Sequence, residues 1–351
     1  MSDVILYGYD VSPFTVKVIH SFLLHHWLVA HIRQIDYVLL LKNIRHEKVI
    51  VANMIPRPEI TDLLGVTYRR IPILVIGNDV YCDTSLITSA LERRFPASQG
   101  YGTIFPNRKH GGGADTGLIK AFVKHWADTA LFFLGVRVID WERRPPEFIK
   151  DRSTFLGGQI NLEALVAGRG NALSTLSTHL FLVEEQLSDG REWLFDTELP
   201  SLADVSVQVI FAWIRRNHVA ESLFDPGIFP KFLEWFARMT AYFEELKQKQ
   251  PVTPRISGEA AAARIAAAPF EPYAVVGFDT REGERLGVKL GDDVSIDRED
   301  SANMQVNFPT VGKLVALNRE EFVVEGTGSA GRVRCHFPRI GFTASLVSQS
   351  K

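Results

Sequence analysis

The sequence of 351 residues is poor in cysteine, with only Cys82 and Cys335. Two cysteines cannot build the disulfide framework of a small secreted domain, and their scarcity is typical of a reducing compartment. Acidic and basic side chains nearly cancel, and the net charge of −2 argues against electrostatic binding of nucleic acid. Apolar stretches end before the roughly 18 residues that a membrane span needs, and no secretory signal is recognisable. We expect a cytoplasmic protein without nucleic-acid or membrane partners.

The sequence also lacks internal repeats, and its patterning divides it into three zones. Residues 1–97 alternate short β-rich runs with helical ones, which is typical of a small α/β sheet. Residues 112–250 carry apolar side chains at helical spacing, which predicts an all-helical bundle. The longest helices are expected at residues 171–187, 201–217 and 230–249.

Residues 270–351 return to short alternating runs after an alanine-rich helix at residues 259–268. The expected strands lie at residues 288–290, 294–296, 313–317, 321–325 and 332–337. Their spacing is typical of a small barrel or sandwich. The fold class predicted for the whole chain is therefore α/β, then all-α, then a small appended β domain.

Three short motifs in the first zone stand where strands and helices meet. An apolar strand at residues 4–7 leads to Ser12-Pro13-Phe14, and proline suits the first turn of a helix. Arg70-Ile71-Pro72 directly precedes a hairpin at residues 73–81. Asp83-Thr84 follows this hairpin at the start of a helix.

In this order the three motifs resemble the N-terminal, thioredoxin-like domain of the glutathione transferases, in the layout of the fungal glutathione transferase-like proteins. They are similar to the family's active-site turn, its basic-apolar-proline element with a cis proline, and its acidic-hydroxyl pair. The resemblance continues into the helical zone, where Ser201 and Asp204 are similar to the family's capping box. It does not cover residues 270–351.

The resemblance implies that glutathione is the co-substrate and that Ser12 is the catalytic residue. A hydroxyl donor at a helix N-terminus lowers the pKa of a thiol, which is ~8.5 in water, so that bound glutathione reacts as a thiolate. The backbone of Ile71 is expected to pair with the tripeptide, and Arg70 or Lys17 with its glycyl carboxylate. Asp83 is expected to bind the γ-glutamyl ammonium group, and Thr84 the neighbouring carboxylate. The glutathione-binding residues implied in this way are Phe14, Lys17, Arg70, Ile71, Pro72, Asp83 and Thr84.

A serine in the active-site turn cannot form a mixed disulfide, which argues against thioltransferase chemistry. The expected reaction is conjugation to, or isomerisation of, a small electrophilic molecule, as in detoxification, without a metal ion. A homodimer is also implied, because family members often pair through their N-terminal domains. The alternative is a non-catalytic glutathione-binding or regulatory protein that keeps the scaffold and contacts a partner through its β domain.

Simpler interpretations of the motif residues stay open. Ser12, or Asp83 with Thr84, could only cap a helix. Tyr7 or Tyr9 could donate to the sulfur in place of Ser12, although Tyr7 is more readily explained by packing in the first strand.

Other residues have a structural and a functional interpretation as well. Trp126, Phe132 and Phe133 could line an acceptor pocket or belong to the bundle core. Cys82 is best explained as a small buried side chain of the hairpin. The histidines at 20, 25, 26 and 31 have no acidic residue among them, so we expect no metal site there.

Residues 14–55 contain no proline or glycine, a run far longer than the family's first helix and second strand. Removing residues 18–34 joins Lys17 to Ile35 and leaves an ordinary amphipathic helix, followed by a strand at residues 46–51. Every valine codon begins with GT, and glutamine can be encoded by CAG, so the codons of this segment are compatible with the two ends of an intron. We hypothesise that residues 18–34 are a translated, unspliced intron; the alternative is a genuine extension of the helix.

Overall fold

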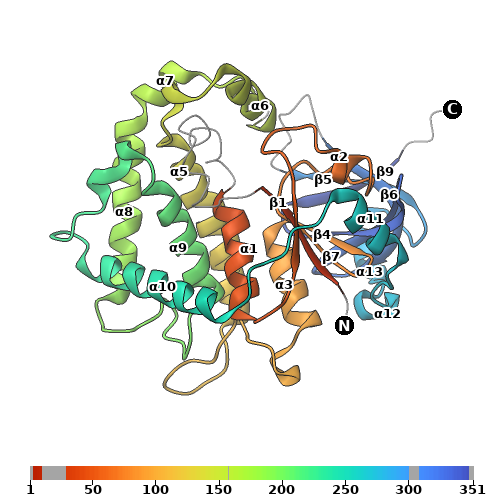
Figure 1. Ribbon diagram of the computed structural model, residues 1–351, viewed down its shortest axis with the longest axis horizontal. Coiled ribbons are helices and arrows are strands. Elements are labelled where there is room, and N and C mark those ends of the chain that lie inside the picture. Colours follow the sequence, from red (N-terminus) through yellow and green to blue (C-terminus); the bar gives the residue numbers. More distant parts are fainter. Residues whose placement is uncertain (1–2, 10–28, 157, 300–307, 348–351) are drawn as a thin grey trace.

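The computed structural model describes residues 3–9, 29–156, 158–299 and 308–347. Figure 1 shows a helical bundle on one side and a twisted sheet on the other, with α1 between them. The strands are β1 (Val4–Gly8), β2 (Glu47–Ile50), β3 (Ile73–Ile76), β4 (Asp79–Cys82), β5 (Asp293–Arg298), β6 (Thr310–Leu317), β7 (Glu321–Gly328), β8 (Gly331–Pro338) and β9 (Phe342–Leu346).

The helices fall into those of the sheet, those of the bundle and those of the C-terminal part. They are α1 (Val29–Leu41), α2 (Pro58–Thr61), α3 (Thr84–Arg94), α4 (Thr116–Ala121), α5 (Phe132–Arg137), α6 (Pro146–Leu156), α7 (Leu162–Ala167), α8 (Arg169–Leu187), α9 (Leu202–Ile214), α10 (Pro230–Lys249), α11 (Gly258–Ala267), α12 (Tyr273–Val276) and α13 (Thr280–Leu286). A segment of π-helix, η3 (Phe122–Leu131), joins α4 to α5. Within the described ranges no helix has both the length and the apolar character that a membrane span requires.

The N-terminal strands form the thioredoxin-like part of the sheet that the first zone predicts. β1 pairs parallel with β2 and antiparallel with β3, and β3 continues through a tight turn into β4. Every residue of β1, β3 and β4 is buried. Continuous apolar runs such as Ile73–Ile76 are typical of strands covered on both faces, which explains their position in the middle of the molecule.

The C-terminal strands extend this sheet and do not form a separate barrel or sandwich. β8 pairs parallel with β4, with Val80 opposite Cys335, and the sheet runs in the order β2-β1-β3-β4-β8-β7-β6-β5-β9. The appended C-terminal strands are thus present as predicted, but they join the N-terminal sheet and do not form the small barrel or sandwich that their spacing suggested. The strand spacing indicated the strands correctly, but spacing carries no information about which distant edge a strand joins.

The strand predicted at residues 288–290 is absent from this described part of the chain. Gly287, with φ of 69°, ends α13 in the left-handed conformation. The Val288 N–H then bonds to the Gly283 carbonyl at 3.0 Å, and the Val288 side chain is buried. The apolar residues that suggest a strand thus belong to a Schellman-type helix end, in which a buried residue commonly follows the glycine.

The bundle confirms the predicted helical zone, and α9 lies at its centre. α9 is rich in β-branched residues, which favour strands when exposed, but almost all of its side chains are buried. Its N-terminus carries the predicted capping box: the Ser201 N–H donates to Asp204 at 2.9 Å, and the same carboxylate accepts from Trp235 Nε1 at 3.0 Å. Capping and burial together outweigh the local preference for a strand.

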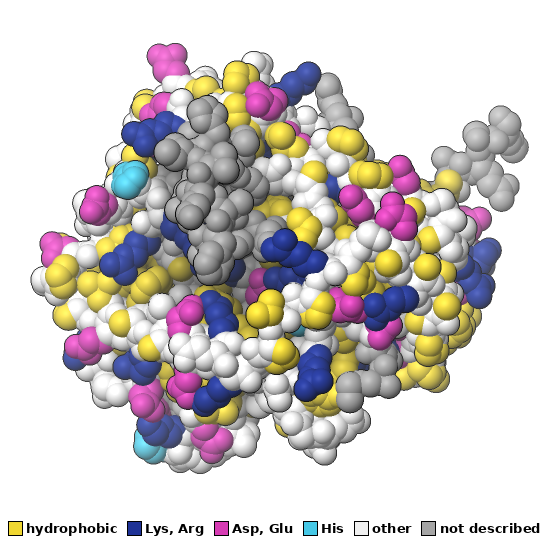
Figure 2. Space-filling model, viewed as in Figure 1, with side chains coloured by type: hydrophobic (Ala, Val, Ile, Leu, Met, Phe, Trp, Pro, Cys, Tyr) yellow, Lys and Arg dark blue, Asp and Glu magenta, His cyan; other side chains and the backbone are white. Residues whose placement is uncertain are grey.

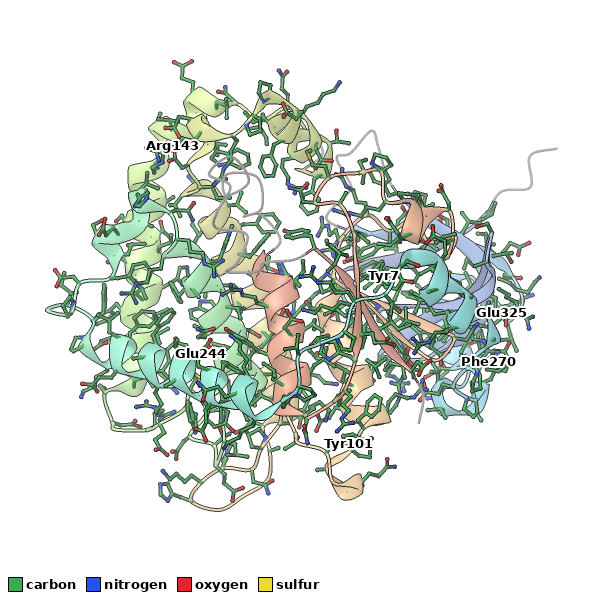
Figure 3. All side chains as sticks on the ribbon, in the orientation of Figure 1. Tyr7, Tyr101, Arg143, Glu244, Phe270 and Glu325 are labelled. Atoms are coloured by element: carbon green, nitrogen blue, oxygen red, sulfur yellow. The ribbon has the colours of Figure 1, made fainter. Side chains whose placement is uncertain are left out.

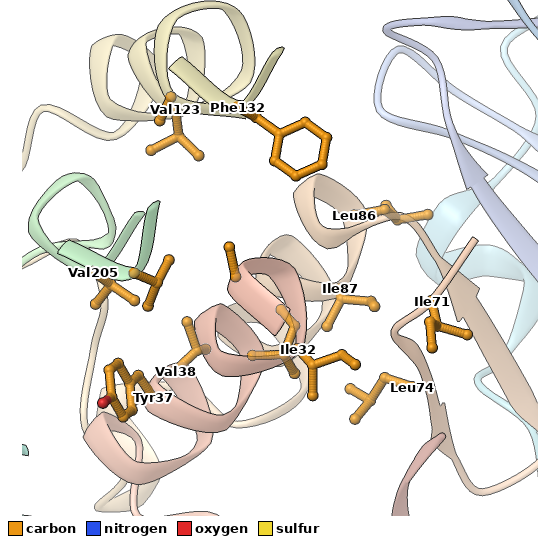
Figure 4. Close-up of a cluster of buried hydrophobic side chains, with 14 of the residues drawn as sticks. Ile32, Tyr37, Val38, Ile71, Leu74, Leu86, Ile87, Val123, Phe132 and Val205 are labelled. Atoms are coloured by element: carbon orange, nitrogen blue, oxygen red, sulfur yellow. The ribbon is translucent and has the colours of Figure 1, made fainter. Parts of the chain in front are cut away.

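α1 holds the sheet and the bundle together. Its residues Ile32 and Val38 are buried, and Figure 4 shows them between Leu74 of the sheet, Ile87 of α3 and Val205 of α9. One continuous core therefore reaches from the sheet into the bundle, and the pocket described below opens at its edge.

The segment after α10 crosses back over the sheet and leads into the C-terminal part. The Lys48 N–H donates to the Pro254 carbonyl, and the Ile256 N–H donates to the Lys48 carbonyl, each at 2.9 Å. Further along, the Arg334 guanidinium lies 3.3 Å from the Phe270 ring centre and 3.3 Å from Glu325. Figure 3 shows Phe270 and Glu325 near one another on this side of the molecule.

Candidate functional site

A pocket of about 380 Å³ lies where the sheet, the bundle and the C-terminal strands meet. The sequence-predicted residues that line it are Arg70, Ile71, Pro72, Asp83 and Thr84. Residues from η3, α5 and α6 form the opposite wall, and residues from β5 and from the turn between β8 and β9 close one end. Figure 2 shows Lys and Arg side chains spread over one face of the molecule, among acidic and apolar ones.

The structure brings together five of the eight residues that the motifs predict. The loop before β3 carries Arg70, Ile71 and Pro72, with a cis peptide bond at Ile71–Pro72 as the resemblance implies. Asp83 and Thr84 start α3 at the other side of the hairpin. The remaining three, Ser12, Phe14 and Lys17, lie outside the described residues.

Asp83 is the most heavily bonded carboxylate of the pocket. It caps α3 by accepting from the Ser85 N–H at 3.1 Å and from the Ser85 hydroxyl at 2.6 Å. Lys124 Nζ lies 3.2 Å from its Oδ1, and Arg298 Nη1 lies 2.8 Å from its Oδ2. Burial alone would raise the pKa of Asp83, but Lys124 and Arg298 outweigh it and hold the pKa well below its usual range. Asp83 is therefore ionised at all ordinary pH values.

A second carboxyl, Asp128 on η3, has the opposite character. Its Oδ2 accepts from the Thr84 hydroxyl at 3.3 Å, and its Oδ1 lies 3.4 Å from Gln34 Nε2. Burial raises the pKa of Asp128 to about 7, although Lys124 opposes the shift. Near neutral pH this group can hold or release a proton at the edge of the pocket.

An aromatic wall faces the motif residues. Phe132 and Phe133 of α5 line the pocket, as the acceptor-pocket interpretation predicts, together with Phe155 of α6. The Arg70 guanidinium lies 4.6 Å from the Phe155 ring centre. Trp126 takes no part in this wall, because its indole N–H points to α8 and donates to His179 Nδ1 at 3.0 Å. It belongs to the bundle.

His31 is the one residue of the predicted histidine cluster whose surroundings are described. It is buried in the pocket wall, 4.5 Å edge-on from the Phe132 ring, and its pKa is lowered to about 4 by burial. Its Nδ1 has no hydrogen-bond partner among the described residues. The described ranges contain no group of three or more His, Cys, Asp or Glu residues arranged to hold a metal ion.

Two other sequence interpretations concern buried residues of the sheet. Tyr7 is fully buried in β1, as expected for a packing residue, and Figure 3 places it in the middle of the sheet. Burial raises the pKa of its hydroxyl. Cys82 is also fully buried, and burial raises the pKa of its thiol well above the usual value, so it has the properties of a core side chain.

The sequence analysis missed several residues of the pocket, among them Lys124, Asp128 and Arg298. Lys124 and Asp128 are spaced by four residues within one helical segment, and this spacing could have indicated a charged pair on one face. Arg298 left no such signal. It lies 215 residues from Asp83 in sequence, in the part of the chain that the resemblance does not cover.

Comparisons with protein-family models and with solved structures both support the fold. Residues 6–99 match the family model described as the glutathione S-transferase N-terminal domain, and residues 142–248 match a domain of unknown function (DUF7962). The chain matches none of the curated proteins with which it was compared.

The solved structures that it resembles include a GST-like protein from Pseudomonas syringae. The two share 24% of their residues at a TM-score of 0.68, over 99% of this chain and 100% of the other. A rice glutathione S-transferase in complex with glutathione is 16% identical, with a TM-score of 0.48, over 76% of this chain and 97% of that one. The chain thus has a glutathione S-transferase-like fold, and the match over residues 6–99 supports a place in the glutathione S-transferase superfamily.

Proposed function

We propose that this chain is a glutathione transferase-like enzyme that activates the glutathione thiol for attack on a small electrophile. The observation that carries the proposal is the convergence of Arg70, Ile71, Asp83 and Thr84 on one pocket, opposite an aromatic wall. A peptide thiol held along the motif residues would face Phe132 and Phe133, where an apolar acceptor would bind. Conjugation and glutathione-assisted isomerisation share this first step.

In this proposal the tripeptide lies along the loop before β3. The Ile71 backbone pairs with its central peptide unit, and Arg70 or Lys17 binds the glycyl carboxylate. Thr84 and the N-terminal amides of α3 receive the γ-glutamyl end. Pro72 and Phe14 complete the wall around it. Ser12 is the proposed catalytic residue, donating to the sulfur so that it reacts as a thiolate.

The test combines binding with turnover. Calorimetric titration of the protein with glutathione is expected to show saturable binding, and an activated aryl halide is expected to be conjugated. Ser12→Ala should lower kcat/KM by roughly a hundredfold or more, because it removes the donor that favours the thiolate. The exposed Ser174→Ala is the matched control and should leave the rate unchanged. Absence of saturable glutathione binding would remove the proposal.

A second candidate is a non-catalytic glutathione-binding protein. Two cations already bind Asp83 and would compete with a ligand ammonium group at that carboxylate, so glutathione would be held less firmly in the orientation that turnover requires. Retention on immobilised glutathione without any conjugation would support this candidate against the enzyme.

We also propose a cytoplasmic location, and keep the homodimer as a proposal. The outer edge of β4 is paired with β8, so two copies that associate through their N-terminal domains must use another surface of that domain.

A further inference from the structure

Asp128 lies between the two walls of the pocket. It belongs to η3, which continues directly into α5, and both Asp128 and the aromatic Phe132 line the pocket from this helical segment. The Asp128 carboxyl also contacts the wall that carries the sequence motifs, because the Thr84 hydroxyl donates to its Oδ2 at 3.3 Å. The carboxyl is therefore within reach of both the motif residues and the aromatic wall.

The helical segment that carries Asp128 has an unusual backbone. Phe122–Leu131 is a π-helix, whereas α4 before it and α5 after it are α-helices. π-helical segments are rare and are frequently found at functional sites. Four residues of this one line the pocket, namely Lys124, His125, Asp128 and Thr129. The irregular backbone thus coincides with the polar part of the pocket wall.

The partners of Asp128 differ from those of the neighbouring carboxylate. Asp83 is paired with two cations, one of which is Lys124 of the same π-helix. Asp128 has no ion pair among the described residues. Its hydrogen-bond partners there are two neutral donors, the Thr84 hydroxyl at 3.3 Å and Gln34 Nε2 at 3.4 Å. Two carboxyls whose surroundings separate their pKa values in this way are a common basis of acid–base catalysis.

The charged groups that line the pocket balance one another. They are the cations Arg70, Lys124 and Arg298, the anions Asp83, Glu299 and Asp128 itself, and the histidines His31 and His125. Burial has the largest effect on the pKa of Asp128 and raises it to about 7, while Lys124 lowers it and Asp83 raises it. The pKa of His31 is lowered to about 4, so this imidazole stays neutral where Asp128 titrates. Near neutral pH, part of the molecules therefore carry a proton on Asp128.

We propose that Asp128 is a second catalytic residue, a proton donor that allows this pocket to use α,β-unsaturated carbonyl compounds as electrophiles. The assignment rests on the proposed function and names its class of substrate. The glutathione thiol first loses its proton to water. As the thiolate sulfur bonds to the β-carbon, the C=C electron pair shifts toward the carbonyl oxygen, and this oxygen takes the proton of Asp128. The enol that forms returns to the carbonyl form in water, and Asp128 regains its proton from water.

Two electrophiles separate proton donation from activation of the thiol. Addition to trans-2-nonenal places a proton on the substrate, whereas chlorodinitrobenzene loses chloride and needs no proton. Both react with the same thiolate, so the ratio of their kcat/KM values cancels the effect of pH on the thiol. For the full chain, the ratio of nonenal to chlorodinitrobenzene should fall roughly tenfold between pH 6 and pH 8, as Asp128 loses its proton.

Asp128→Asn keeps the shape of the side chain and cannot transfer the proton. At pH 6 its kcat/KM with nonenal should fall by roughly tenfold or more, whereas that with chlorodinitrobenzene should change by less than about threefold. The ratio of the two should no longer depend on pH, and Asp128→Glu should restore part of the lost rate. Asp293→Asn, at a side chain that is 69% exposed, is the matched control, and melting temperatures report whether each variant is folded.

The outcomes distinguish this inference from the proposed function. If the full chain neither binds glutathione nor conjugates chlorodinitrobenzene, the proposed function is wrong, and the inference is wrong with it. If chlorodinitrobenzene is conjugated but nonenal is not, or if Asp128→Asn slows both reactions equally, the inference alone is wrong. A ratio that is the same at pH 6 and pH 8 in the full chain would also contradict the inference alone.

Discussion

Asp128 shows how one buried side chain can make the molecule sensitive to pH. The carboxyl is enclosed by Thr84, Gln34 and η3, and burial raises its pKa to about 7. Its pKa in the unfolded chain is near 3.9. A carboxyl whose pKa is raised on folding favours the folded state most at low pH, and this contribution is lost as the pH rises from about 4 through 7.

We predict that Asp128→Asn removes this pH dependence. Asparagine has the same shape and cannot ionise, so the variant should gain stability relative to the original chain by up to about 4 kcal/mol at pH 8, but by only about 1.5 kcal/mol at pH 5. Urea unfolding at both pH values measures the difference. The exposed Glu244→Gln is the control and should change neither value. An equal effect of Asp128→Asn at the two pH values would contradict the raised pKa.

At the scale of residues, the sequence predicts part of the site well. Arg70, Ile71, Pro72, Asp83 and Thr84 were found because each stands beside a strand or helix end that has its own local signal. Arg298 could not be found, because its role depends on a strand pairing that brings β5 to α3. The bonding of Asp83 was missed for the same reason.

At the scale of elements, the register of α1 bears on the hypothesis about residues 18–34. α1 has 13 residues, Val29–Leu41. In a chain without residues 18–34, Lys17 directly precedes Ile35. If the helix keeps its register, Lys17 takes the position of Gln34, and Ser12 takes the position of Val29. Phe14 would take the place of His31. The Nδ1 atom of His31 has no hydrogen-bond partner among the described residues, and its ring packs against Phe132. An aromatic ring without polar atoms suits this position better.

The shortened chain would place a second cation near Asp128, in addition to Lys124. Gln34 Nε2 lies 3.4 Å from Asp128 Oδ1 and 2.7 Å from Ser206 Oγ. A lysine in this place faces the buried carboxyl and should lower its pKa. We therefore predict that the variant lacking residues 18–34 loses the pH dependence described above and binds glutathione more tightly than the full chain.

The matched control is the deletion of residues 19–34 alone. It leaves one extra residue before Ile35 and so turns the preceding residues by about 100° around the helix. Calorimetry with glutathione and urea unfolding at pH 5 and pH 8 compare the two deletions. Identical behaviour of both would contradict the register argument, and a messenger RNA that always retains the 17 codons would contradict the intron hypothesis.

Most helices were predictable, because their apolar faces repeat at a local spacing. The last long helix of the bundle was expected at residues 230–249, and the structure has α10 at Pro230–Lys249. The prediction of a strand at residues 288–290 failed because its two apolar residues, Val288 and Leu290, fit a strand and a helix end equally well. The division into residues 1–97, 112–250 and 270–351 stays a prediction.

At the scale of the whole molecule, a buried charge network joins β4 to the C-terminal strands. His336 Nε2 lies 3.2 Å from Asp79 Oδ1, and its Nδ1 lies 2.6 Å from Glu321 Oε2. Arg94 pairs with Asp79 at 3.0 Å, and Arg93 with Glu321 at 3.0 Å. Burial lowers the pKa of His336, but its hydrogen bonds to the two carboxylates outweigh burial and the pKa is raised.

We predict that His336→Gln destabilises the protein in a pH-dependent manner. A raised histidine pKa contributes stability that is complete below about 6.5, the unfolded value, and is lost as the pH rises through the higher folded value. The variant should therefore lose most stability near pH 6, about 3 kcal/mol or more, because two buried carboxylates are left without the cation that they share. At pH 9 the loss of stability should be smaller.

Thermal unfolding across this pH range provides the measurement. The exposed His218→Gln is the control and should leave the profile unchanged. A loss of stability that is the same at pH 6 and pH 9 would show that His336 acts by packing alone, for example against Tyr81, whose ring centre is 4.4 Å away.

The pairing of β4 with β8 has a consequence for synthesis. Asp79 and His336 are 257 residues apart, so the N-terminal strands leave the ribosome long before the strand that covers their edge. Until then β4 presents unpaired backbone groups, which readily recruit strands from other nascent chains. We therefore expect products of interrupted translation that stop before β8 to aggregate more readily than the full chain.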